Sequence, residues 1–523
     1  MPTLNQLLTN GFFPQELPPV FSTSSFASAA TGSNGGLVEH MSTGGPNKAE
    51  TCVHNMVRSG GLRRHLGIPN PIHYSRLSWF VVQNWTALQQ SSQRSPFSLT
   101  QPVDTGTNRA ISASHGFSER TIRRAELRSS GRFLLHLDIN RYYPSIYTHS
   151  VPWAIHGKDV VKHAMAEGSL NALWSNRLDA HLRNMNDQQT VGIPIGPDTS
   201  LLIAECILAA VDEELITTIP NLRGIRFIDD YEFVVNLRSE AELVISTLQF
   251  ILSKYELALN PTKTQIIELP HPIEPLWTSR LRTFVFRDAG TLGQRNDLTA
   301  YFDTAFTLAR EALGEPVINY AISRLNAVAI EEDNWQIFQY MLSQCARSEP
   351  ACLPQVCDQI SYYRSSGLLV DTPLWINCLE HIILERLPLG QASEALWALW
   401  IMKQLDITLS EAVGTAVDRC EDAPVALMAL SMANNGLGNP ATFTRLHSFA
   451  EPSELFGQHW LLCYEANMQE WLNPPSGVDA LGVHPQFDFL RNQNVSFFNI
   501  NALPNIPTRH TLGSFSGGAG GGY

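Results

Sequence analysis

The sequence has no C-x-x-C pair, although eight cysteines are scattered along its 523 residues. This scatter argues against a zinc site and favours reduced thiols. No apolar run approaches the length of a membrane span, and the first residues lack the charged-then-apolar order of a secretion signal. These absences predict a cytoplasmic protein without membrane contact, long enough for about two to four domains.

The chain also lacks a net positive charge, because 36 Lys and Arg stand against 49 Asp and Glu, a balance of −13. The balance is uneven: residues 1–284 hold 24 basic and 24 acidic residues, and residues 285–523 hold 12 and 25. Residues 51–132 hold 11 basic and 3 acidic residues, a net charge of +8. Such a segment suits a nucleic-acid backbone or a triphosphate, and a solvated basic face is the other interpretation.

Two adjacent carboxylates, Asp229 and Asp230, lie between apolar runs rich in β-branched and aromatic residues. This pattern predicts a strand, a tight turn and a second strand, with the acidic pair at the turn. A solvated hairpin tip gives the same pattern. Because adjacent buried carboxylates are costly unless a cation joins them, and Mg²⁺ prefers oxygen ligands, a magnesium site is the alternative.

A third carboxylate, Asp138, follows the mostly apolar run at residues 133–137. The run predicts a buried strand that delivers this carboxylate at its end, although an Asp that caps the next helix looks alike. Residues 192–196, Gly-Ile-Pro-Ile-Gly, predict a shaped loop whose glycines let the backbone approach a ligand closely. A plain strand-to-helix loop is equally compatible with them.

Basic side chains recur near these segments. Arg120, Arg123, Arg124 and Arg128 are three or four residues apart and therefore predict one helix face. Lys263 follows a short strand and a turn. Each of these could contact phosphate or lie on a solvated surface.

The composition divides the chain into four regions. Residues 1–50, rich in Pro, Ser, Thr and Gly, predict an extended arm, and residues 51–290 hold the strand patterns, with a last short strand at 283–287. Residues 291–505 have helical patterns that recur in segments of roughly 30 to 45 residues. This spacing favours an array of stacked helix pairs. Residues 506–523 form a glycine-rich tail that predicts a flexible end.

Taken together, these motifs resemble the palm of a reverse transcriptase in order and spacing. Asp138 matches motif A, residues 192–196 motif B, residues 227–230 motif C, and residues 259–264 motif D.

The match has two departures. Phe227 stands for the usual Tyr of motif C, which removes one hydroxyl, and Ile195 stands for the usual Gln of motif B, which alters how template or nucleotide is held. Within the superfamily, residues 138–150 and 153–158 resemble the bacterial defence-associated reverse transcriptases of the abortive-infection type.

The resemblance implies an α+β fold: a right-hand polymerase domain of fingers and palm over residues 51–290, then an all-α, HEAT-like or thumb-like domain over 291–505. It implies an RNA-directed DNA polymerase, a nucleotidyltransferase that adds dNTPs to a hydroxyl primer with two Mg²⁺ ions. The implied setting is antiphage defence in the bacterial cytoplasm, as a homo-oligomer that binds RNA, as template or non-coding RNA, and its DNA product. Members of the group differ in template use, and some use a protein hydroxyl as primer.

The resemblance also implies residue roles. Asp138 and Asp229 would hold the metal ions, Asp230 would be a ligand or a support, and the carbonyl of Ile139 could join them. Tyr143 matches the steric gate that selects dNTPs.

Further residues would surround the substrate. Gly192, Pro194 and Gly196 would shape the floor under the nascent base pair, and Arg124 and Arg128 would clasp the triphosphate. Lys263 would bind or protonate pyrophosphate, with a solvated turn lysine as the alternative.

The primer residue is open. Tyr523 ends the glycine-rich tail and could reach the site, and Ser514, Ser516 and Tyr74 compete with it. Two rival functions also stay open: a conventional RNA-templated reverse transcriptase, and a catalytically inactive helical scaffold that acts through partner binding.

Overall fold

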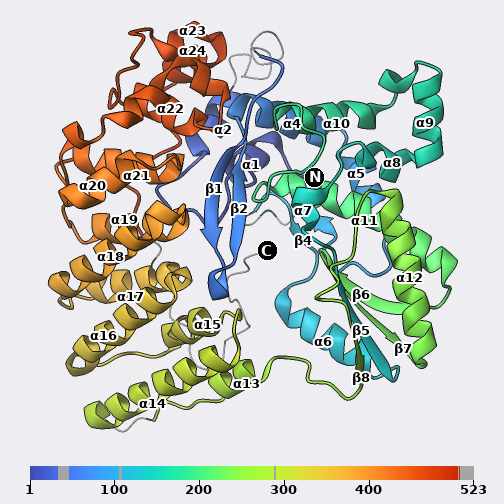
Figure 1. The fold of residues 1–523 in the computed structure, drawn as a ribbon, viewed down its shortest axis with the longest axis horizontal. Helices are drawn as coiled ribbons and strands as arrows, with labels where there is room; N and C mark the ends of the chain where they lie inside the picture. The colour runs from blue at the N-terminus through green and yellow to red at the C-terminus, as the bar shows by residue number, and fades with distance from the viewer. Residues whose placement is uncertain (33–45, 105, 107–108, 288–289, 505, 507–523) are drawn as a thin grey trace.

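The computed structural model describes residues 1–32, 46–104, 106, 109–287, 290–504 and 506. The fold is α+β and mostly helical, with a column of C-terminal helices on one side and a small sheet with its own helices on the other (Figure 1). A β-hairpin, β1 (Cys52–Val57) with β2 (Arg63–Ile68), lies between these two parts. Within the described ranges, no helix combines the length and apolarity needed to cross a membrane.

The main sheet has four antiparallel strands. They are β5 (Phe133–Asp138), β6 (Arg223–Phe227), β7 (Asp230–Val235) and β8 (Gln265–Glu268), in the spatial order β6-β7-β5-β8. Leu137 pairs with Tyr231 and Leu135 with Phe233, and all four are buried in the main core. The same register places Asp138 directly opposite Asp230. The predicted strand, turn and strand around the acidic pair are therefore confirmed.

Helices cover both faces of this sheet. On one face lie α11 (Asp198–Thr218) and α12 (Arg238–Lys254), and α11 is buried along most of its length. On the other face lies α6 (Phe117–Arg128), whose Leu127 packs with Leu134 and Val234 in a small separate cluster.

The chain before residue 290 contains further helices and short strands. They are α1 (Leu4–Thr9), α2 (Ser24–Thr31), η1 (Ser59–Gly61), α4 (Pro71–Gln83), α5 (Trp85–Ser92), β3 (Pro102–Val103), β4 (Ser112–Ala113), α7 (Tyr142–Ser145), α8 (Ser150–His156), α9 (Lys158–Ala166), η2 (Leu170–Ala172), α10 (Trp174–Asn184) and α13 (Leu276–Arg282). Figure 1 shows α8, α9 and α10 above the sheet, in the upper right part of the view.

Two local predictions are wrong. The N-terminal segment is not an extended arm: it forms α1, whose first turn is closed by a capping box from Thr3, and α2, and it buries Phe12 and Phe26 completely. The expected strand at 283–287 is irregular, because the rings of Phe284 and Phe286 pack on Tyr301 instead of pairing in a sheet.

After residue 290, the described chain is helical. Its elements are α14 (Gly290–Glu311), α15 (Val317–Arg324), η3 (Leu325–Ala327), α16 (Glu332–Ser348), η4 (Pro350–Cys352), α17 (Leu353–Ser365), α18 (Thr372–Arg386), η5 (Leu387–Leu389), α19 (Ala392–Gln404), α20 (Glu411–Asp418), α21 (Ala423–Asn434), η6 (Pro440–Thr442), η7 (Arg445–Ala450), η8 (Pro452–Phe456), α22 (Trp460–Met468), α23 (Ala480–Val483) and α24 (Pro485–Asn492). Helices two places apart, such as α15 with α17 and α17 with α19, pack on one another. A HEAT-like repeat stays a prediction.

The two ends of the described chain meet. Phe21 bridges to Phe498, and the Ser25 hydroxyl donates to the carbonyl of Ser496 at 2.7 Å. The ring of Phe497 packs against Phe26. Tyr523, Ser514 and Ser516 lie outside the described residues.

Candidate active site

The acidic pair lies at a two-residue turn, Ile228–Asp229, because Phe227 pairs with Asp230 across β6 and β7. Ile228 has a φ of 55°, a left-handed conformation that is strained for a β-branched residue. Its N–H donates to Thr100 Oγ1 at 3.0 Å, and its carbonyl accepts from Arg226 Nη1 at 2.7 Å. The N–H and the carbonyl of Ile228 are therefore both hydrogen-bonded. These two bonds also fix the position of the next residue, Asp229.

A buried ion-pair network supports this turn. Arg226 is 0% exposed; its Nε binds Asp212 at 2.8 Å, and its Nη1 and Nη2 bind Glu205 at 2.9 and 3.0 Å. The Tyr231 hydroxyl donates to Asp212 at 2.7 Å. Since Glu205 and Asp212 belong to α11, the network ties the β6–β7 hairpin to that helix.

The three predicted carboxylates are brought together. Asp138 pairs with Asp230 across β5 and β7, and the Ile139 N–H donates to the Asp229 carbonyl at 3.3 Å. Burial, followed by the charges of Asp138 and Asp230, raises the pKa of Asp229 to about 7. The strand register and these charge interactions show that three carboxyl groups from distant parts of the sequence lie near one another.

Cationic side chains approach two of these carboxylates. Lys263 Nζ lies 2.7 Å from Asp138 Oδ2, and Asn260 Nδ2 donates to Asp138 Oδ1 at 3.3 Å. Arg120 Nη2 lies 3.5 Å from Asp230 Oδ2, and His136 Nε2 lies 3.7 Å from Asp230 Oδ1. Burial acts to raise the pKa of Asp230, but its interaction with His136 and the charges of Arg120 and Lys263 bring the pKa below its ordinary value.

The carboxylates suit a hard divalent cation by their chemistry. All three offer carboxylate oxygens, the ligand type that Mg²⁺ prefers, and burial followed by the two neighbouring carboxylates disfavours the charged form of Asp229, which a bound cation would stabilise. However, no set of three or more His, Cys, Asp or Glu side chains in the described residues is arranged so that it could hold a metal ion. With Lys263 on Asp138, the side chains are in an ion-paired arrangement rather than a metal-binding one.

The glycine-rich loop lies beside Tyr143 as the motif order implies. The Ile193 N–H donates to the Tyr143 carbonyl at 3.1 Å. Gly192 has a φ of 91°, and Gly196 has a φ of 129° with the ring of Pro14 only 2.6 Å from where a Cβ would lie. A side chain at Gly196 would therefore be strained and would clash with the N-terminal segment.

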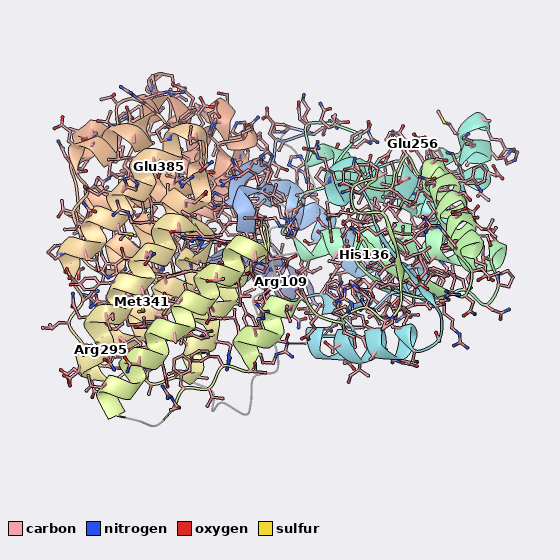
Figure 2. The ribbon with its side chains drawn as sticks, turned by 60° about the horizontal axis from the view of Figure 1, so that its bottom comes forward. Arg109, His136, Glu256, Arg295, Met341 and Glu385 are labelled. Carbon is pink, nitrogen blue, oxygen red and sulfur yellow. The ribbon has the colours of Figure 1, made fainter. Side chains whose placement is uncertain are left out.

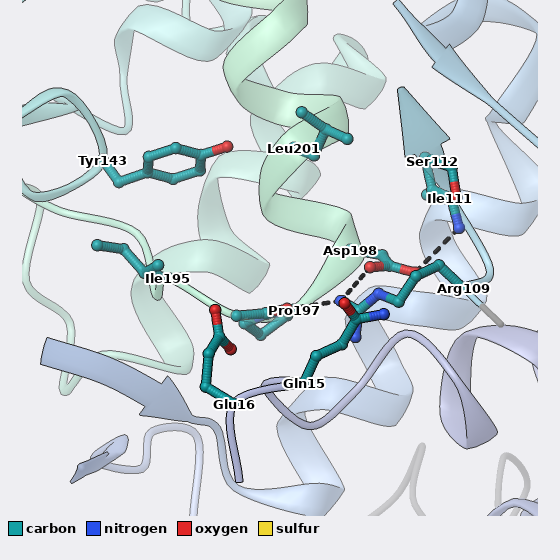
Figure 3. A pocket seen from close by; sticks show the side chains of 11 residues that line it. Gln15, Glu16, Arg109, Ile111, Ser112, Tyr143, Ile195, Pro197, Asp198 and Leu201 are labelled. Carbon is teal, nitrogen blue, oxygen red and sulfur yellow. Dashed lines mark hydrogen bonds and ion pairs between the residues drawn. The ribbon is translucent and has the colours of Figure 1, made fainter. Parts of the chain in front are cut away.

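A cavity of about 80 Å³ opens at this loop, lined by Tyr143, Ile195, Glu16 and Leu201 among others (Figure 3). Glu16 comes from the N-terminal segment and points toward the cavity, and its carbonyl accepts from Trp397 Nε1 of α19 at 3.1 Å. The cavity is smaller than the roughly 300–1,000 Å³ of ordinary ligand pockets. A whole nucleotide would require this segment to shift.

Arg109 closes one side of the cavity. Its guanidinium is ion-paired with Asp198 and donates to the Gly196 carbonyl at 2.7 Å. Figure 2 shows Arg109 near the middle of the molecule, between the helices that carry Met341 and the sheet that carries His136.

Arg124 and Arg128 are not available in the predicted way. Both guanidiniums are ion-paired with Glu232, which is 4% exposed on β7, and Arg128 also donates to the Pro272 carbonyl at 2.7 Å. Their predicted role as triphosphate ligands finds no support in these contacts, because both guanidiniums are held on the same buried carboxylate. The spacing of the arginines predicted that they share one face of a helix. It did not predict that this face contacts Glu232.

Arg64 on β2 is a residue that motif reasoning missed. Burial lowers its pKa, Arg58 lowers it further, and Glu16, Asp229 and Tyr143 raise it. Its Nη1 is buried and has no hydrogen-bond partner among the described residues. An unsatisfied guanidinium N–H within electrostatic reach of Asp229 and Tyr143 is suited to binding an anion. The sequence signals for it were its place in the basic segment 51–132, whose arginines are expected to bind triphosphate, and the adjacent arginines at 63–64.

Comparisons with known proteins give little. No family model matches the chain, and no curated protein matches it. Among solved structures, it is similar to a telomerase from Candida albicans in complex with a fragment of telomeric RNA, with 10% identity, a TM-score of 0.30, and coverage of 67% of this chain and 65% of that one. It is also similar to an apo telomerase from Candida tropicalis, with 10% identity, a TM-score of 0.31, and coverage of 75% and 69%. Scores this low assign no family.

Proposed function

We propose that the protein is a nucleotidyltransferase of the reverse transcriptase type, which adds dNTPs to a hydroxyl primer. The observation that carries the proposal is the meeting of Asp138, Asp229 and Asp230 at one supported turn, from segments about ninety residues apart. The motif order that resembles a reverse transcriptase palm adds support, because it anticipated this meeting from the sequence.

In this proposal Asp138 and Asp229 hold two Mg²⁺ ions, with Asp230 or the Ile139 carbonyl as a further ligand. The bound ions would activate the attacking hydroxyl and stabilise the leaving pyrophosphate. Lys263 must leave Asp138 when that carboxylate becomes a ligand, which frees its ammonium for pyrophosphate.

The other residues position the nucleotide. Tyr143 stands at the cavity and would exclude a 2′-hydroxyl, while Gly192, Pro194 and Gly196 shape the loop below the base. Arg64 replaces Arg124 and Arg128 as the proposed triphosphate ligand, because its Nη1 is buried without a partner among the described residues.

The decisive experiment is incorporation of labelled dNTPs by the purified protein with Mg²⁺, with and without added RNA. We expect Asp229→Asn and Asp138→Asn each to lower incorporation by a factor on the order of 10² or more, because such a metal is worth several kcal/mol. Asp303→Asn, at an exposed position of α14, is the matched control. Wild-type incorporation by Asp229→Asn would disprove the assignment. Activity only with added RNA would favour a conventional templated enzyme.

The finer expectations rest on the resemblance to the abortive-infection group. They are antiphage defence in a bacterial cytoplasm, homo-oligomers, a non-coding RNA partner and priming by a protein hydroxyl such as that of Tyr523. Plating phage on cells with wild-type protein or Asp229→Asn tests the first of these. Mass spectrometry of DNA-linked peptides identifies the priming residue.

One observation favours the inactive scaffold instead. Lys263 lies on Asp138, and the described side chains form no three-residue metal group. In a scaffold this ion pair would be permanent, so that Lys263→Ala would destabilise the protein and no variant would incorporate dNTPs. Retained phage protection by Asp229→Asn would support that function.

A further inference from the structure

The β1–β2 hairpin makes hydrogen bonds and ion pairs with the C-terminal helices. His54 Nδ1 lies 3.0 Å from both carboxylate oxygens of Asp422 at the start of α21, and the Val57 N–H donates to Ser393 Oγ of α19 at 2.8 Å. Both His54 and Asp422 are nearly inaccessible, with side chains 2% and 8% exposed. Figure 1 shows the hairpin between these helices and the sheet.

The strongest of these contacts is a two-pronged ion pair. Arg63 Nη1 lies 2.6 Å from Glu394 Oε1, and its Nη2 lies 3.0 Å from Glu394 Oε2. Glu394 is 2% exposed, so the pair is shielded from solvent on the carboxylate side. Such paired hydrogen bonds fix both distance and orientation.

Successive side chains of a strand point to opposite faces. Arg63 contacts the helices, and Arg64 is therefore directed to the other face, where Asp229 and Tyr143 act on its pKa. At the far end of β2, the Gly67 N–H donates to the Ile195 carbonyl at 2.8 Å, which ties the strand to the glycine-rich loop. The strand is thus held at one end by the loop and at the other by Glu394.

We propose that Glu394 is a positioning residue for nucleotide binding, which holds Arg64 in place through Arg63. The inference rests on the proposed function and adds to it a role for the C-terminal helices: they set the position of the arginine that meets the triphosphate. Glu394 does not touch the nucleotide. Its loss releases the Arg63 end of β2, next to Arg64, and a misplacement on the order of 1 Å is enough to weaken a charged contact strongly.

The test is steady-state dNTP incorporation by four forms: wild type, Arg64→Ala, Glu394→Gln and the double variant. We expect Arg64→Ala and Glu394→Gln each to raise KM for dNTP about tenfold or more, with kcat changed by less than about threefold. The double variant should show no rise beyond that of Arg64→Ala, because both changes remove one contact. Glu411→Gln, at an exposed carboxylate on α20, should match wild type.

A second variant guards against loss of folding. Glu394→Asp keeps the charge, shortens the side chain by one methylene and should give a smaller rise in KM. An unchanged KM for dNTP in both Glu394→Asp and Glu394→Gln would overturn the inference. A KM in the double variant that exceeds the KM of Arg64→Ala would also overturn it. So would an unchanged KM in Arg64→Ala. In each of these cases the proposed function stands if wild type incorporates dNTPs and Asp229→Asn does not, whereas an inactive wild type removes both.

Discussion

Replacing Arg226 by Met should loosen the turn that carries Asp229. The substitution leaves Glu205 and Asp212, 1% and 0% exposed, without their cation, and it removes the donor to the carbonyl of strained Ile228. Breaking a buried ion pair on one side costs about 3–5 kcal/mol. Both carboxylates keep hydroxyl donors, from Ser95 and Tyr231 for Asp212 and from Ser98 and Thr100 for Glu205, which favours the lower part of that range.

Amide hydrogen exchange measures this loss locally, which suits a chain too large for a single unfolding transition. At about 1.4 kcal/mol per factor of ten, exchange in β6 and β7 should accelerate by a factor on the order of 10² to 10³. Arg223→Met is the matched control, because Arg223 lies on the same strand and is exposed. Equal exchange in the two variants would refute the reasoning that the buried pairs hold the turn.

Three further outcomes follow from the site and the core. Tyr143→Ala should reduce the preference for dNTP over NTP by about tenfold or more in competition assays, and an unchanged ratio would exclude Tyr143 as the gate. Arg128→Ala should lower the melting temperature, because Glu232 loses one partner, and should leave KM for dNTP within about twofold of wild type; a large rise in KM would restore its predicted role. Burial raises the pKa of Glu465 to about 8. The stability that Glu465 contributes is therefore fully present below its unfolded pKa of about 4.5 and is lost as pH rises through about 8. In melting curves, Glu465→Gln should make the decline in stability over this pH range shallower than in wild type, and an unchanged pH profile would contradict the reasoning.

The meeting of the carboxylates was accessible from the sequence because each has a strong local signal. Asp138 ends a mostly apolar strand, and Asp229 and Asp230 interrupt two others, so that strand ends place all three. The loop at 192–196 has the glycines that its positive φ values at Gly192 and Gly196 require. Short-range patterns of this kind depend only on neighbouring residues.

The sequence could not predict contacts between residues that are far apart along the chain. Glu394 meets Arg63 over a separation of 331 residues, and nothing near either residue identifies the other. Arg128 has the spacing of a phosphate-binding helix face, yet Glu232 neutralises it across 104 residues. The N-terminal segment has a loop-like composition, but tertiary packing of Phe12 and Phe26 decides its structure.

The contact between the two ends of the described chain has a consequence for synthesis. Ser25 and Ser496 bond across 471 residues, so the aromatic cluster around Phe26 lacks Phe497 until nearly all of the chain has left the ribosome. At roughly 5–20 residues per second, this wait lasts about half a minute or longer. Pro14 and Glu16, which border the cavity, belong to the same early segment. A nascent chain would therefore complete this cavity only after residue 497 has left the ribosome, and termination before that residue would leave the cavity unfinished and the aromatic rings uncovered.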